Sequence, residues 1–146
     1  PDGKYEGWNL WSWPEGGDGA AFAFDGADIF GRYAIVPFPK SPGRAGFIVK
    51  AGIATDDSNK FFFSHVVETA RLVSLVGFDN AERIFPAVHP DTPFVLVTLG
   101  RATEPSRLLN YVLRIEHLND PRREFRLSVD EFALINPNTR SCWTTG

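Results

Sequence analysis

The chain has 146 residues, a formal net charge of −3 and one cysteine, and 43% of its residues are hydrophobic and 23% charged. These proportions are ordinary for a globular protein and exclude wholesale disorder and an internal disulfide. The negative charge gives no general attraction to nucleic acid and does not favour it as a partner. No apolar run approaches the roughly 20 residues of a membrane span, so no membrane partner is expected.

The first third of the chain predicts short strands separated by turns. Residues 5–14 hold three of the four tryptophans. If this segment is a strand, Trp11 and Trp13 project from one face and Trp8 points inward. Further strands are expected at 20–24, 31–38 and 46–50, between turns rich in Gly, Pro and Asp. Short strands at this spacing predict part of a β-sandwich.

The composition changes near residue 52, and the next segment gives two conflicting signals. Helical spacing of Val66, Ala70 and Val73 predicts an amphipathic helix over 65–74. The β-branched residues of 72–76 favour a strand at its end instead.

The remaining third predicts mixed secondary structure. Residues 94–99 and 111–115 are expected to be strands, and Ser128 with Glu131 forms a capping-box pattern that predicts a short helix. The expected fold class is therefore α+β and β-rich, with a partial β-sandwich in the N-terminal half and mixed strands and helices in the C-terminal half.

Residues 1–52 resemble a known binding module in the order and spacing of their motifs. The W-N-L-W-x-W core of 5–14, the turn at 15–19, the segment 26–31 and the strand at 46–50 are similar to the pullulanase-associated starch-binding module, carbohydrate-binding module family 41. The resemblance implies a non-catalytic β-sandwich that binds an α-glucan polysaccharide or a maltooligosaccharide.

In that family two tryptophans stack on the sugar, and the resemblance assigns this role to Trp11 and Trp13. The family completes its site with a Trp, a Lys and an Asp after the strand that matches 46–50. This chain has no Trp there, and Lys50 and Asp57 are the weak polar candidates. From the residues alone, packing in a core is the favoured role of the aromatic pair, because aromatic stripes usually pack, and only the resemblance favours sugar stacking.

Residues 62–142 resemble the end of the catalytic domain of adenine-specific DNA methyltransferases of restriction systems. The most specific piece is Ile-Asn-Pro-Asn-Thr-Arg at 135–140. The Asn-Pro-Pro-Tyr motif and the glycine-rich S-adenosylmethionine motif of that family are missing, so no methylation is expected. Arg122, Arg123 and Arg140 would contact DNA phosphates under this resemblance, and a solvated charged face is the alternative.

Two incomplete resemblances predict domains at 1–55 and 56–146 and, with them, a chimera. No acid pair marks a glycosidase, and no histidines stand at metal-ligand spacing, so we expect no catalytic residue, metal or cofactor. The expected function is non-catalytic α-glucan binding, with a DNA methyltransferase fragment or a ligand-free chimera as alternatives. Open sheet edges favour a homo-oligomer.

Overall fold

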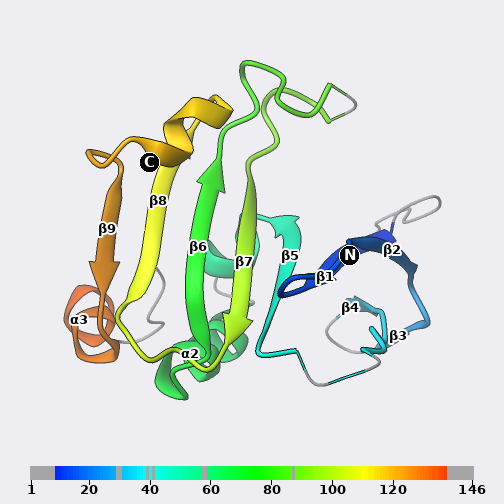
Figure 1. Ribbon diagram of the computed structural model, residues 1–146, viewed down its shortest axis with the longest axis horizontal. Helices are drawn as coiled ribbons and strands as arrows, with labels where there is room; N and C mark the ends of the chain where they lie inside the picture. The colour runs from blue at the N-terminus through cyan, green and yellow to red at the C-terminus, as the bar shows by residue number, and fades with distance from the viewer. Residues whose placement is uncertain are drawn as a thin grey trace.

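The computed structural model describes residues 9–28, 31–38, 40, 42–56, 59–86 and 88–137. These residues form one open, mixed sheet of seven strands in the order β2-β1-β5-β7-β6-β8-β9, and a separate two-stranded hairpin, β3 with β4 (Figure 1). The expected class, α+β and β-rich, is confirmed. The strands are β1 (Asn9–Pro14), β2 (Ala20–Ala23), β3 (Gly26–Asp28), β4 (Gly31–Tyr33), β5 (Arg44–Lys50), β6 (Leu72–Phe78), β7 (Phe94–Gly100), β8 (Ser106–Val112) and β9 (Glu124–Leu127).

Early and late strands share this one sheet. The strands β1, β2 and β5, expected as part of a sandwich, extend the sheet formed by β6 to β9, because β5 pairs antiparallel with β7 along its whole length. All neighbours are antiparallel except β6 and β8, which are parallel. The boundary predicted at residue 55 stays a prediction, and the sheet runs continuously across it.

One face of the sheet packs against helices α1 (Gly52–Thr55), α2 (Lys60–Glu68) and α3 (Val129–Ile135). Helix α2 buries Phe63, Val66 and Val67, whose i, i+3, i+4 spacing places them on one side of the helix. They pack in one cluster with sheet residues such as Leu75 and Leu108, both fully buried. We call this side of the sheet the helix face.

The opposite side, which we call the open face, has a smaller apolar cluster at one end. Val76, Leu109 and Val112 are buried there together with the partly buried Leu118 of the 3₁₀ helix η2 (Ile115–Asn119). Figure 1 shows η2, in gold, at the end of the sheet opposite to α2 and α3. No helix among the described residues is assigned to the remainder of this face.

The local predictions were right where the signal was strong. The strands predicted at 20–24, 46–50 and 94–99 correspond to β2, β5 and β7. The capping box is confirmed in full: Ser128 Oγ accepts a hydrogen bond from the Glu131 backbone N–H, and Glu131 Oε2 accepts from the Ser128 backbone N–H at 2.7 Å.

The helix predicted over 65–74 was wrong at both ends. Helix α2 lies at Lys60–Glu68, and Ala70 follows it with φ +51°. The Arg71 N–H donates to the Val66 carbonyl and the Ala70 N–H to the Val67 carbonyl, which is the Schellman pattern that closes a helix. The β-branched segment then starts β6 at Leu72, as the competing signal indicated.

Two predicted strands also differ in extent. The strand expected at 31–38 is regular only over Gly31–Tyr33. The strand expected at 111–115 is β8, which starts at Ser106 and ends at Val112. Tyr111 has φ +54°, a left-handed conformation that interrupts strand alternation, and η2 begins at Ile115. Separately, no described helix has both the length and the apolar character that crossing a membrane requires.

Candidate functional site

Strand β1 presents the two tryptophans on the open face. Cross-strand partners share a face, and Ser12, between the tryptophans, pairs with Phe47, which pairs with Val97 of the helix-face core. Trp13 pairs instead with Gly46. Strand alternation therefore places Trp11 and Trp13 together on the open face, as the sequence predicted.

Both indoles lie against glycines. A Cβ added at Gly19, which precedes β2, would lie 2.5 Å from Trp11 Nε1, and a Cβ added at Gly46 would overlap the Trp13 indole. Each ring thus rests directly on backbone, where any side chain would displace it. Trp11 is 45% exposed, whereas Trp13 is half-buried.

The polar candidates of the predicted sugar site are not brought beside this pair. Lys50 is exposed at the end of β5, four residues beyond Gly46, a span of about 13 Å in an extended strand. Asp57 lies outside the described residues, as does Trp8.

A cavity of about 420 Å³ opens on the same face as the tryptophans. Ser74 and Thr98, which line it, belong to a row of cross-strand partners that begins at Trp13 and crosses six strands. In order, the row is Trp13, Gly46, Thr98, Ser74, Arg107 and Arg126. The lining comprises Arg44, Val73, Ser74, Thr98, Ala102, Thr103, Glu104, Pro105, Arg107 and Arg126.

Carboxylates compensate the arginines of this cavity. Arg107 Nε donates to Glu124 Oε2 at 2.8 Å, and this hydrogen bond is the main cause of the lowered pKa of the Glu124 carboxyl. Arg126 lies 3.2 Å from Glu104 and 3.4 Å from Glu124.

The third arginine, Arg44, is also compensated, with its Nη1 3.8 Å from Glu15 Oε1. The three guanidinium groups are therefore paired with the carboxylates of Glu15, Glu104 and Glu124, and the cavity has little net charge.

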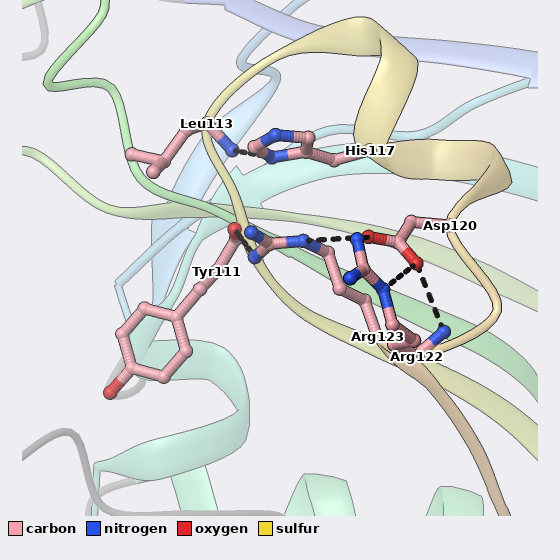
Figure 2. A network of polar contacts seen from close by, with 6 residues as sticks. All are labelled: Tyr111, Leu113, His117, Asp120, Arg122 and Arg123. Carbon is pink, nitrogen blue, oxygen red and sulfur yellow. Dashed lines mark hydrogen bonds and ion pairs between the residues drawn. The ribbon is translucent and has the colours of Figure 1, made fainter.

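Two of the three arginines predicted to contact DNA, Arg122 and Arg123, have a carboxylate partner within the chain (Figure 2). Arg122 donates twice to Asp120, at 2.9 Å each, and these hydrogen bonds are the main cause of the lowering of the Asp120 pKa to about 2. Arg123 lies 3.7 Å from Asp120 and donates to the Tyr111 carbonyl at 2.7 Å. Arg140 lies outside the described residues.

Two of the three histidines, His89 and His117, accept a hydrogen bond from a nearby backbone N–H. His117 Nδ1 accepts from the Leu113 backbone N–H at 3.3 Å (Figure 2), and His89 Nδ1 accepts from the Asp91 N–H at 3.3 Å. Among the described residues, no three His, Cys, Asp or Glu side chains gather as metal ligands would.

Sequence reasoning missed the glycines under the tryptophans and the arginines of the cavity. The sequence indicated only that Gly19 lies in a turn and Gly46 in a strand. A glycine by itself does not indicate which aromatic ring will pack against it. The arginines come from three strands whose pairing is not local in sequence. An isolated glycine inside a strand is nevertheless a known sign of close approach, and Gly46 carried that sign.

The comparisons with known proteins agree with the N-terminal resemblance and extend it. No solved structure matches the chain. The family model of the bacterial pullanase-associated domain matches residues 1–77, which include Trp11, Trp13 and nearly all of β6. The matched segment runs past residue 62, where the methyltransferase resemblance begins, and nothing found supports a methyltransferase segment or a chimera. Because the match spans more than half of its 146 residues, the chain belongs to the bacterial pullanase-associated domain family.

Proposed function

We propose that this chain is a non-catalytic α-glucan-binding module in which Trp11 and Trp13 form the stacking platform. The observation that carries the proposal is the pair of indoles on the open face of β1, with Trp11 45% exposed, in a chain of the pullanase-associated family. A core role would have buried both rings, and Trp11 is far from buried.

The physical basis is the match between an indole and the apolar face of a pyranose ring. Stacking removes apolar surface of both partners from water, while the sugar hydroxyls remain hydrated at the rim. The glycine contacts hold both indoles against the backbone, so little side-chain freedom is lost when a ligand binds. Trp11 offers more surface than the half-buried Trp13, so we expect it to contribute more.

Lys50 and Asp57 have a minor place in this proposal. Lys50 shares the open face with Gly46 by strand alternation, but it stands at the far end of β5. A glucan would have to follow β5 to reach it. We therefore expect Lys50→Ala to weaken binding much less than Trp11→Ala.

Affinity electrophoresis in gels that contain amylopectin or glycogen tests the proposal. The unmodified chain should be retarded, and Trp11→Ala should abolish most of the retardation. The matched control is Phe61→Ala, which removes another exposed aromatic side chain, 78% exposed, from α2. Unretarded migration of the unmodified chain, or equal retardation of Trp11→Ala, would refute the proposal.

A further inference from the structure

The cavity and the tryptophan pair lie on the same face of the sheet, two strands apart. Gly46 pairs with Trp13 on one side and with Thr98, in the cavity lining, on the other. Two strand spacings separate Trp13 from Thr98, about 10 Å in all. Because Gly46 has no side chain, no side chain of β5 stands between the two at this position of the row.

The lining combines groups that suit sugar hydroxyls. Ser74, Thr98 and Thr103 each carry a hydroxyl that can donate and accept, while the arginines donate and Glu104 accepts. Val73, Ala102 and Pro105 add apolar patches to the same walls. Such a mixture of directed polar groups and apolar surface is typical of small-ligand sites.

The balance of charges favours a neutral ligand. Each arginine of the lining has a carboxylate partner within 4 Å, so an anion would gain little attraction and would face three acidic groups. Paired guanidinium and carboxylate groups still retain free hydrogen-bonding positions for neutral hydroxyls.

The Arg107 side of the cavity is held in position by hydrogen bonds within the chain. Arg107 donates to Glu124 at 2.8 Å and to the Leu118 carbonyl at 3.1 Å, which ties its side chain to β9 and η2. A side chain already fixed loses little freedom on binding. Arg126, 47% exposed beside it, keeps more of its surface open to a ligand.

We propose that this cavity is a second subsite of the α-glucan site, which receives further neutral glucose units of a chain that stacks on Trp11 and Trp13. The proposal rests on the proposed function, because the tryptophans anchor the ligand. The family model matches residues 1–77, and of the residues that line the cavity only Arg44, Val73 and Ser74 lie within this segment. Most of the cavity is therefore formed by residues outside the matched segment. The subsite is thus assigned from this chain's own structure.

Isothermal titration with maltotriose and maltoheptaose tests the subsite. Maltotriose is short enough for the tryptophans alone, whereas maltoheptaose can also enter the cavity. We expect the unmodified chain to bind maltoheptaose more tightly than maltotriose. Arg126→Gln should weaken maltoheptaose binding about five- to tenfold, which corresponds to the loss of one or two hydrogen bonds. The same substitution should leave maltotriose binding unchanged.

A blocking variant and a control complete the design. Thr103→Trp, on an exposed bend, should fill the cavity and reduce maltoheptaose affinity to that of maltotriose. Arg101→Gln removes an exposed arginine that precedes Thr103 by two positions and does not line the cavity. It should change the affinity for neither maltotriose nor maltoheptaose. Far-ultraviolet circular dichroism and thermal unfolding check that each variant is folded.

The outcomes separate the subsite from the platform. If Trp11→Ala loses both ligands while Arg126→Gln and Thr103→Trp bind maltoheptaose normally, the subsite is refuted and the proposed function stands. If Trp11→Ala loses neither ligand, or the unmodified chain binds none, the proposed function fails and the subsite with it. Salt-sensitive binding of glucose 6-phosphate or inorganic phosphate at the cavity would show an anion site and contradict the proposal that the cavity receives neutral glucose units.

Discussion

The indole of Trp13 lies on the backbone of Gly46, its cross-strand partner in β5, so closely that a Cβ at residue 46 would overlap the ring. This contact joins the strand that carries the tryptophans to the centre of the sheet. Because Gly46 has no side chain, no β5 side chain stands between Trp13 and Thr98, where the proposed glucan path runs.

Gly46→Ala should therefore displace the Trp13 indole. We expect a loss of stability of about 1–3 kcal/mol from overpacking, together with weaker retention by amylopectin. Chemical denaturation gives the first quantity, and affinity electrophoresis the second. In the control, Gly43→Ala, a Cβ would meet only the end of the flexible Glu15 side chain at 3.0 Å, so little change is expected. Unchanged stability and retention in Gly46→Ala would contradict this role of the contact.

Ser12, between the two tryptophans, is 2% exposed on the helix face, and its hydroxyl has no hydrogen-bond partner among the described residues. A buried hydroxyl without a partner carries a desolvation penalty. Ser12→Ala should consequently leave stability unchanged or raise it by about 1 kcal/mol, as measured by urea unfolding. A loss of more than about 1 kcal/mol would show that the hydroxyl has a stabilising partner after all.

Asn80 organises the connection between β6 and β7. Its fully buried amide donates to the carbonyls of Phe85 and Val88 at 3.1 and 2.9 Å, and its oxygen accepts from the Phe85 N–H at 3.0 Å. Asn80→Ala removes these three partly buried hydrogen bonds together and should destabilise the fold by about 2–4 kcal/mol. Asn119→Ala, at an exposed asparagine of η2, is the control in the same urea-unfolding experiment. Equal stability of the two variants would exclude the proposed role of Asn80.

The ion pair of Asp120 with Arg122 gives a prediction for pH. The Asp120 pKa is lowered from 3.8 to about 2, chiefly by hydrogen bonds from Arg122. A group with a lowered folded-state pKa adds stability above its unfolded pKa and loses it as the pH falls through the folded one. The contribution of Asp120 should thus be complete above about pH 4 and fade towards pH 2.

An NMR titration of the Asp120 carboxyl checks this directly. The midpoint should lie near 2 in the unmodified chain and move towards 3.8 in Arg122→Gln. Arg101→Gln, which removes a different exposed arginine, should leave it in place. A midpoint near 3.8 in the unmodified chain would mean that the pair does not form in solution.

The sequence by itself determined the features that depend on neighbours along the chain. The alternation of residues in β1 placed Trp11 and Trp13 on one face, the apolar run of β7 marked a strand, and Ser128 with Glu131 marked the start of α3. These signals are local, because strand alternation and helix capping involve residues only two or three positions apart. The family resemblance of the N-terminal segment rested on the same local spacing.

Only the tertiary structure decided which strands meet. That Trp13 lies on Gly46, and that Arg44, Arg107 and Arg126 line one cavity, follows from pairings between strands far apart in the sequence. Strand register is set by the burial of whole faces and not by any single residue, so no local pattern predicts it. For the same reason, the strands that suggested half of a sandwich lie in the same sheet as the strands that suggested an unrelated second domain. The backbone groups at an open strand edge can pair with any strand that also helps to bury the common core.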